Sequence, residues 1–354
     1  MGTEFIPGLE LSRRFYEEAV RSLLNEHFPF LKYAAGLIGF GSEVLGYDTI
    51  QSTDHDWGPR VILFLPEENY AEQFPHVLAI LQKRLPVEFG GYPVIPKNQT
   101  RDAVGVQLFT LGGFIQDYLG FDLRNPIEPA DWLTFPEQKL LSITSGAVFW
   151  DDIGLEDMRR RFEYYPRDVW LYLLAAGWKS IGQDESLMGR AGQVGDEVGS
   201  ALIAARLVRN LMQLWFRMNK QYAPYSKWFG TGFSRLADTG NLVPIFENVL
   251  RAETWTERQE YLAQAYEVTA AKHNSLNITA LVTEKRSYFF DRPFLVIGGK
   301  DVAEAIRVQI TDPAVRKWAG DRLIGSVDQF SDSTDVLADT RWRDALKKFY
   351  AGDQ

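Results

Sequence analysis

The sequence predicts an α/β N-terminal region with a small mixed sheet and helices, followed by a mainly helical C-terminal region. Two patterns lead to this prediction. The first 160 residues alternate short apolar runs with helical spacing, whereas helical spacing dominates from Pro166 onwards. The chain has 354 residues, 45% of them hydrophobic and 24% charged, which is typical of a globular protein with more than one domain. We expect domains at residues 1–160, 161–285 and 286–354.

The N-terminal region is expected to combine helices with a mixed sheet. Helical spacing predicts helices over residues 11–28 and 71–85, the second with apolar residues on one side. Short apolar runs predict strands near residues 33–40, 92–95, 104–111 and 146–150, and a further apolar run covers residues 61–65.

The clearest helix of the second domain carries a stripe of apolar or small residues at steps of four and three. Its members are Val194, Val198, Ala201, Ala205, Val208, Met212 and Trp215. Four polar residues fall largely off the stripe and predict a solvated face, with contact to a nucleotide or acceptor as the alternative: Arg206, Arg209, Gln213 and Arg217. The last segment combines a strand-like run at 288–297, a helix at 302–310 and an acidic stretch at 326–335, and we expect it to pack on the helical domain.

A Gly-Ser turn followed by an Asp-x-Asp pair is the most informative pattern in the chain. Gly41 and Ser42 come at the end of the predicted strand 33–40, where a glycine backbone and a hydroxyl can approach phosphate oxygens. Asp54 and Asp56 follow, and in an extended segment both side chains would point to the same face. Paired carboxylates suit Mg²⁺ or Mn²⁺, which prefer oxygen ligands and complete their shells with substrate phosphates.

The alternative is that these are ordinary turn and capping residues. The Gly-Ser turn alone, or the Asp-x-Asp pair alone, would be weak evidence for such a site. Their order, after one apolar strand and before the apolar run 61–65, favours a nucleotide and metal site.

At these residues the sequence resembles the nucleotidyltransferase superfamily, whose motif places a Gly-Ser turn 9 to 13 residues before an Asp-x-Asp pair. Three segments resemble the DUF4037 proteins, nucleotidyltransferase-like proteins of unknown function: Ser52–Gly58, Gly189–Gly192 and Ala223–Trp228. The resemblance implies that Gly41 and Ser42 bind phosphates and that Asp54 and Asp56 hold the metal. The sequence departs from the superfamily motif at two places. His55 replaces a hydrophobic residue, and Gly58-Pro59 disfavours a central strand directly after the pair.

The resemblance implies transfer of a nucleoside monophosphate from a nucleoside triphosphate to a hydroxyl of a small molecule. In related antibiotic nucleotidyltransferases a helical domain supplies the base, for which Glu185 is the best match. Arg190 and Lys227 are expected to neutralise the charge of the triphosphate. The nucleotide base, the acceptor and the oligomeric state stay open.

A third carboxylate, which many members of the superfamily carry on a neighbouring strand, is replaced here by Gln107. Asp151, Asp152 and Glu185 are the possible substitutes. If none of them acts, the protein would bind and sense nucleotide without turnover. Modification of a protein or a tRNA is a further alternative.

Composition excludes several other classes of function. A net charge of −9 lacks the positive field of a nucleic-acid binder and disfavours a polynucleotide substrate. The chain has no cysteine and four scattered histidines, which excludes thiolate chemistry and disfavours a zinc hydrolase. We see no signal peptide and no apolar run of membrane-spanning length, and therefore expect a cytoplasmic protein without a membrane partner.

Overall fold

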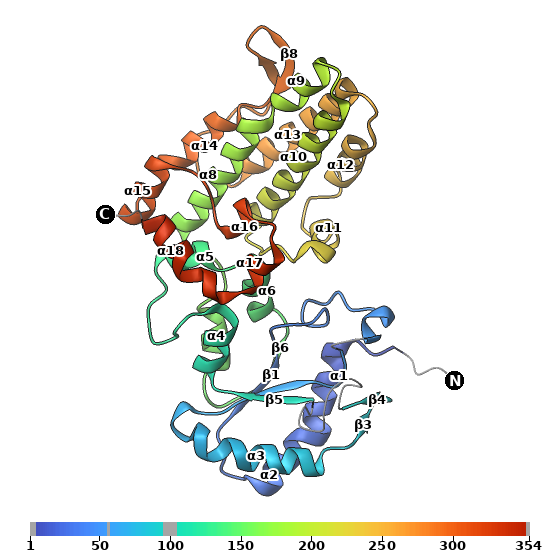
Figure 1. Ribbon diagram of the computed structural model, residues 1–354, viewed down its shortest axis with the longest axis vertical. Coiled ribbons are helices and arrows are strands. Elements are labelled where there is room, and N and C mark those ends of the chain that lie inside the picture. The colour runs from blue at the N-terminus through green and yellow to red at the C-terminus, as the bar shows by residue number, and fades with distance from the viewer. Residues whose placement is uncertain (1–4, 55–56, 95–104, 352–354) are drawn as a thin grey trace. The chain divides into compact units, whose positions relative to one another are not determined.

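Residues 5–54, 57–94 and 105–351 are described by the computed structural model, in which the chain divides into two units (Figure 1). The first unit comprises residues 1–126 and 139–163, and the second comprises residues 127–138 and 164–354. The chain passes between the units after residues 126, 138 and 163, and the second of these points lies inside helix α6 (Glu137–Thr144). Each unit has its own core and is described by itself.

A four-stranded mixed sheet organises the first unit. Its strands lie in the order β5 (Val106–Phe109), β2 (Val61–Phe64), β1 (Ala34–Leu37) and β6 (Ala147–Asp151). β1 is antiparallel to both of its neighbours, and β2 is parallel to β5. The end of β1 and the starts of β2, β5 and β6 therefore meet at one edge of the sheet.

Helices cover both faces of this sheet because successive strand residues point to opposite sides. On one face, α1 (Gly8–Phe15), a π-turn at Tyr16–Val20, α2 (Arg21–His27) and α3 (Tyr70–Arg84) enclose the main apolar core. Val77 and Leu81 of α3 are fully buried there, together with Leu63 of β2. On the other face, Phe114 of α4 (Leu111–Leu119) packs on Phe64, with ring centroids 5.5 Å apart.

Most of the predicted elements of this unit are confirmed, with shorter strands. β1 covers only four residues of the predicted 33–40 because Gly39 and Gly41 adopt positive φ angles that end the extended backbone. The expectation that the run 92–95 completes the sheet is wrong over its described residues. There, β4 (Tyr92–Pro93) pairs with β3 (Glu88–Phe89) in a separate hairpin. A last helix, α7 (Leu155–Arg160), follows β6.

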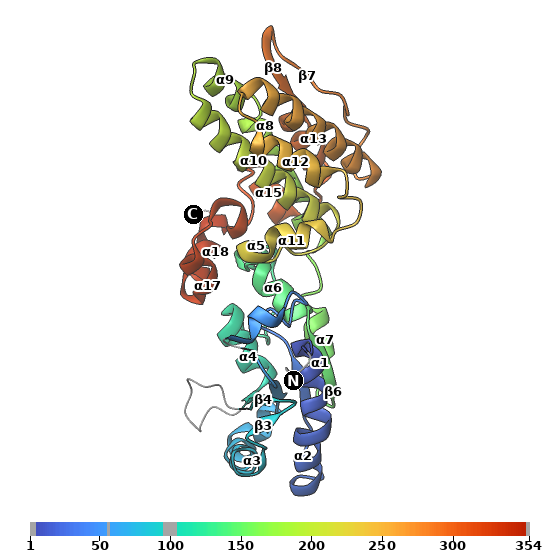
Figure 2. The same ribbon diagram turned by 90° about the vertical axis from the view of Figure 1, so that its right-hand side faces the viewer.

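The second unit is mainly helical, as predicted. Its one strand pair is the hairpin of β7 (Ser287–Phe289) and β8 (Arg292–Val296) among the residues described. Its helices are α5 (Pro129–Thr134), α8 (Arg167–Asp184), α9 (Leu187–Gln193), α10 (Glu197–Met218), α11 (Phe229–Ser234), α12 (Leu242–Arg251), α13 (Trp255–Ser275), α14 (Gly299–Arg307), α15 (Pro313–Asp321), α16 (Val327–Phe330), α17 (Thr334–Ala338) and α18 (Arg343–Ala351). α8 is buried along most of its length and packs against α10 (Figure 2) and against α14 (Figure 1). In the described part of the chain, no helix has an apolar stretch long enough to cross a bilayer.

The side of α10 that faces the core differs only in part from the predicted stripe, since Val208 and Trp215 of the stripe are buried. Val194 precedes the helix, and Val198 and Ala201 are exposed. The buried side instead follows Leu207, Leu211 and neighbouring large residues, because these fill the space between α8 and α13. The predicted solvated face is also wrong in part, since the side chains of Gln213 and Arg217 are buried.

Candidate functional site

The described residues of the Gly-Ser and Asp-x-Asp motif lie on chain segments that leave and enter the sheet at one edge. Gly41 and Ser42 follow the end of β1, and Asp54 precedes the start of β2, its antiparallel neighbour. An antiparallel pair brings the end of one strand beside the start of the next. The topology therefore brings the backbone segments that carry Gly41, Ser42 and Asp54 to one edge of the sheet, which the sequence order alone does not guarantee.

Gly41 sits in a tight turn that no larger residue fits. Its φ angle is +132°, and a Cβ atom built there would lie 2.5 Å from both Arg60 Nη2 and Glu43 Oε2. A single turn over Ser42–Gly46 follows, closed by the amide of Tyr47 donating to the carbonyl of Ser42 at 2.9 Å. No helix begins between Ser42 and Thr49, all of which are described, so no helix N-terminus offers free N–H groups there.

A buried ion pair between Glu43 and Arg60 supports this turn. Glu43 is 1% exposed and accepts a hydrogen bond from Arg60, whose guanidinium also donates to the carbonyl of Phe40 at 2.8 Å. Burial raises the pKa of the Glu43 carboxyl, and the charge of Arg60 opposes that shift. Sequence analysis missed this pair because two charged residues 17 positions apart carry no periodic signal.

Asp48 fixes the loop between the two halves of the motif. Its Oδ2 accepts the backbone N–H of Gly8 at 2.7 Å and the indole N–H of Trp57 at 3.0 Å. Gly8 begins α1, so the loop is tied both to the first helix and to a residue just beyond the aspartate pair. Asp48 was also missed, although its place inside the motif spacer is a usable signal.

The aspartate pair is described only in part. Asp54 is the last residue of a 3₁₀ helix over Ile50–Asp54, so the backbone is not extended there as we had expected. Asp56 and the intervening His55 lie outside the described residues. Over residues 5–54, 57–94 and 105–351, no three acidic or histidine side chains form a group able to hold a metal ion.

The structure shows where Gln107 and its possible substitutes in the first unit lie. Gln107 lies on β5 directly beside Ile62 of β2, and its side chain is exposed. Asp151 pairs in register with Ala34 at the start of β1, which is the opposite edge of the sheet from Gly41. Its carboxylate accepts four backbone N–H groups at the start of α7, and although burial works against it, these donors keep the pKa of Asp151 below its ordinary value. Asp151 and the adjacent Asp152 are therefore not substitutes for Gln107.

Glu185, the predicted base, lies in the second unit and is engaged by backbone donors. Its Oε2 accepts the amides of Ile297 at 2.9 Å and Gly298 at 3.2 Å, and its Oε1 accepts the amide of Gly299 at 3.3 Å. Burial raises the pKa of this carboxyl, against the effect of the three amides. These contacts favour a structural role, in which Glu185 joins the end of α8 to the start of α14.

The two predicted phosphate-binding cations are far apart within the second unit. Arg190 is exposed on α9, which packs beside the start of α10 where Ser200 Oγ donates to Met188 Sδ at 3.2 Å. Lys227 is exposed in a 3₁₀ turn beyond the end of α10, with Nζ 5.0 Å from the centroid of the Trp228 ring. α10 has 22 residues and is about 33 Å long. One triphosphate therefore cannot contact both side chains.

The glycines of the Gly189–Gly192 segment have a packing role. A Cβ atom at Gly192 would lie 2.1 Å from the Cβ of Trp255, and one at Gly189 would lie 2.7 Å from the ring of Phe294. Only glycine lets α9 approach α13 and β8 this closely. This explains the segment without a ligand.

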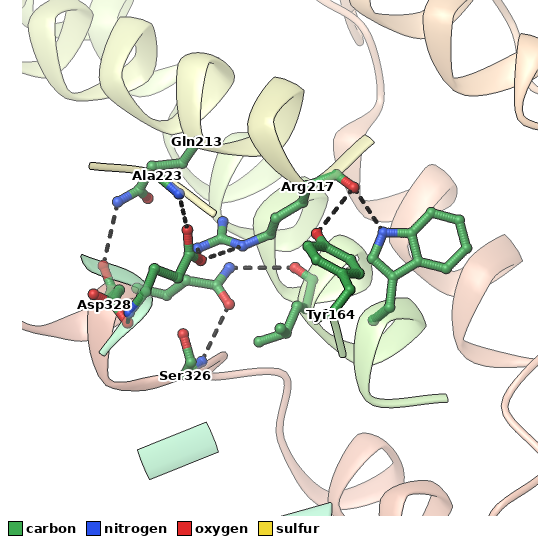
Figure 3. A network of polar contacts seen from close by, with 10 residues as sticks. Tyr164, Gln213, Arg217, Ala223, Ser326 and Asp328 are labelled. Atoms are coloured by element: carbon green, nitrogen blue, oxygen red, sulfur yellow. Dashed lines mark hydrogen bonds and ion pairs between the residues drawn. The ribbon is translucent and has the colours of Figure 1, made fainter. Parts of the chain in front are cut away.

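The Ala223–Trp228 segment is held by a buried polar network (Figure 3). Glu137 Oε1 accepts from the Arg217 guanidinium at 2.7 Å, while Oε2 accepts the amide of Ala223 at 3.0 Å. The side chains of Arg217 and Glu137 are 1% and 2% exposed. The carbonyl of Arg217 also accepts the indole N–H of Trp170 at 2.7 Å. Burial opposes the charge of Arg217, but the Glu137 carboxylate raises the pKa of its guanidinium above the ordinary value.

Comparison with known proteins identifies this part of the chain. Residues 132–229 match the family described as a domain of unknown function, DUF4037. Gly189–Gly192 and Ala223–Trp228 lie inside the match, whereas Ser52–Gly58 lies outside it. The crystal structure of a nucleotidyltransferase-like protein from Exiguobacterium sibiricum 255-15 is similar at a TM-score of 0.33 and 11% identity, over 74% of this chain and 78% of that chain. No curated protein matches the chain. The predicted resemblance to the DUF4037 proteins is thus confirmed over residues 132–229.

Proposed function

We propose that the protein is a metal-dependent nucleotidyltransferase that moves a nucleoside monophosphate from a nucleoside triphosphate to a hydroxyl of a small molecule. The bond between the α- and β-phosphates breaks, a new phosphoester forms, and pyrophosphate leaves. One observation supports this function best: the strand topology gives Gly41, Ser42 and Asp54 a common edge of the sheet.

The donor set at this edge fits Mg²⁺ or Mn²⁺. By their residue type, Asp54 and Asp56 would supply carboxylate oxygens, which are the hard ligands that these ions prefer. When bound, the ion would neutralise charge on the phosphate oxygens. Neither imidazole nor thiolate ligands are needed for such a site.

The turn after β1 would bind the triphosphate. Gly41 has no side chain, so a phosphate could approach its backbone. A larger residue at this position would clash with Glu43 and Arg60. Ser42 is half-buried and would donate its hydroxyl to a phosphate oxygen. The ion pair beneath would keep this turn in one conformation while substrates exchange.

Substitution of Asp54 tests the proposal. We expect Asp54→Asn to lower metal-dependent pyrophosphate release by at least about 100-fold, because a neutral amide is a poor ligand for a hard cation. The measurement uses each of the common nucleoside triphosphates with a panel of small hydroxyl compounds and Mg²⁺ or Mn²⁺. Asp157→Asn, at an exposed residue of α7, is the matched control and should retain full activity. Full activity of Asp54→Asn would contradict the proposal.

Gln107 supports a second function, nucleotide sensing without turnover. It lies on β5, parallel to and beside β2, where the superfamily carries an acidic residue. An amide cannot accept the proton of an attacking hydroxyl. Under this alternative, calorimetry would show tight binding of a non-hydrolysable triphosphate to the wild type with no pyrophosphate release. Gln107→Glu would then gain turnover, whereas a wild type that is already active excludes the sensor.

A further inference from the structure

A cavity of about 230 Å³ lies within the second unit, beside the Ala223–Trp228 segment. Arg209 and Gln213 of α10 form one wall, and Tyr225 and Phe229 form another. The third wall comes from the C-terminal part of the chain, where Asp328 lies on α16. The volume is below the roughly 300 Å³ at which pockets for drug-sized ligands begin, so the cavity suits a smaller molecule.

One part of the cavity lining belongs to the buried network around Glu137. It contains Glu137, whose carboxylate is saturated by Arg217 and the amide of Ala223. The same residue donates its backbone N–H to Asp328 Oδ2 at 3.0 Å, and Gln213 donates to the carbonyl of Asp328 at 3.3 Å (Figure 3). Asp328 is therefore held in a fixed position at the cavity by α6 and α10.

The remaining charges leave one carboxyl of the lining without a cationic partner. Among the described residues that line the cavity, the charged ones are Glu137, Arg209, Asp328 and Asp332. Glu137 is neutralised by Arg217 and Asp332 by Arg209. The group left over is Asp328, so the lining carries a net negative charge that a cationic ligand would balance.

We propose that this cavity binds a small organic ammonium compound. Asp328 would accept a charge-assisted hydrogen bond from the ammonium group, and the rings of Tyr225 and Phe229 would contact its cationic and apolar parts. Every residue involved belongs to the second unit, so the inference stands independently of the proposed nucleotidyl transfer.

Protonation of Asp328 gives the binding a characteristic pH dependence. Burial, together with the Glu137 carboxylate, raises the pKa of Asp328 to about 7. Below this pH the carboxyl is neutral and a weak partner for an ammonium ion. The affinity of the wild type for an amine should therefore rise between pH 6 and pH 8.

Matched amine and alcohol pairs test the inference on the full chain. The probes are 2-amino-1,3-propanediol against glycerol, and cyclohexylamine against cyclohexanol, with dissociation constants measured by ligand-detected NMR at pH 8. We expect each amine to bind at least about tenfold more tightly than its alcohol, because only the amine forms a charged hydrogen bond. Equal binding within both pairs, or no binding by either amine, would overturn the inference.

Variants locate the binding in the cavity. Asp328→Asn keeps the acceptor for the Glu137 amide and should lose at least about tenfold in amine affinity, together with its rise between pH 6 and pH 8. Asp335→Asn, at an exposed residue outside the lining, should bind as the wild type does. If circular dichroism shows that Asp328→Asn is unfolded, Tyr225→Leu at an exposed position decides instead, by weakened binding of cyclohexylamine. Unchanged amine binding in the folded variant would exclude this cavity.

Discussion

At the scale of single residues, paired charged side chains in this protein stabilise the conformation of the backbone beside them. Glu43 and Arg60 form an ion pair at the position that a Cβ atom of Gly41 would occupy. The carboxylate of Glu137 binds both the guanidinium of Arg217 and the backbone amide of Ala223. A buried charge is tolerated only when a partner and further hydrogen bonds compensate for the lost hydration. Removal of one partner is therefore expected to cost more than the pair itself contributes.

Gly41→Ala is expected to destabilise the first unit by about 1–3 kcal/mol, through the positive φ and the clash with Arg60 and Glu43. The measurement is the free energy of unfolding in urea. Gly46→Ala is the matched control, because Gly46 also has a positive φ, +67°, but no atom lies within 4 Å of the position that its Cβ would occupy. Equal losses in the two variants would show that the clash contributes nothing.

Arg217→Met is expected to lower the free energy of unfolding by about 3–5 kcal/mol, since Glu137 would keep a buried charge without its cation. Urea unfolding again gives the value. Arg160→Met removes an exposed ion pair with Asp157 and should cost at most about 1 kcal/mol. A small loss in Arg217→Met would mean that water reaches Glu137.

At the scale of elements, the C-terminal helices complete the second unit by inserting polar groups into it. α14 begins at the amides that Glu185 binds, and α16 places Asp328 beside Glu137. The sequence predicts a helix at 302–310, which corresponds to α14, but not α16. It predicts neither contact, because the partners are separated by more than 100 positions along the chain. Stability of this unit should therefore respond to the ionisation of Asp328.

Asp328 should make the wild type less stable as the pH rises from about 4 to about 7. Its pKa in the folded protein is about 7 against an ordinary value of 3.8, owing to burial and to the Glu137 carboxylate, with Arg217 acting in the opposite direction. The protonated form is thus favoured by folding, and its stabilising contribution is complete below pH 3.8 and lost as the pH rises through about 7. Urea unfolding at several pH values should show that the free energy of unfolding of the wild type falls relative to that of Asp328→Asn as the pH rises over this range. Parallel curves would contradict the assigned environment of Asp328.

At the scale of the whole molecule, the first unit is assembled from two separate stretches of chain. The second stretch, residues 139–163, contributes β6, which pairs with β1. Without it, β1 would become an edge strand with unpaired backbone groups, which promote aggregation.

A fragment of residues 1–163 should therefore fold and give a dispersed NMR spectrum, whereas a fragment of residues 1–126 should aggregate or stay unfolded. Size-exclusion chromatography and NMR compare the two directly. A well-folded shorter fragment would mean that β6 is dispensable for the sheet.

The sequence was sufficient to predict what depends on local pattern. The strands β1, β2, β5 and β6 and the long helices follow from short apolar runs and helical spacing. Gly41 and Ser42 could be placed because their residue types and spacing form a motif. Arg217 could not, since a charged residue on a helix ordinarily predicts solvent, and its partner Glu137 is 80 positions away.

The length of α10 limits which residues a single substrate molecule can contact. A helix rises by a fixed 1.5 Å per residue and so acts as a ruler, here about 33 Å long, with Gly189–Gly192 beside one end and Ala223–Trp228 beyond the other. A ligand that contacts both segments must extend along a large part of this helix, which a single triphosphate does not. A small acceptor meets one segment alone, and the glycine-packed end is already filled by Trp255 and Phe294.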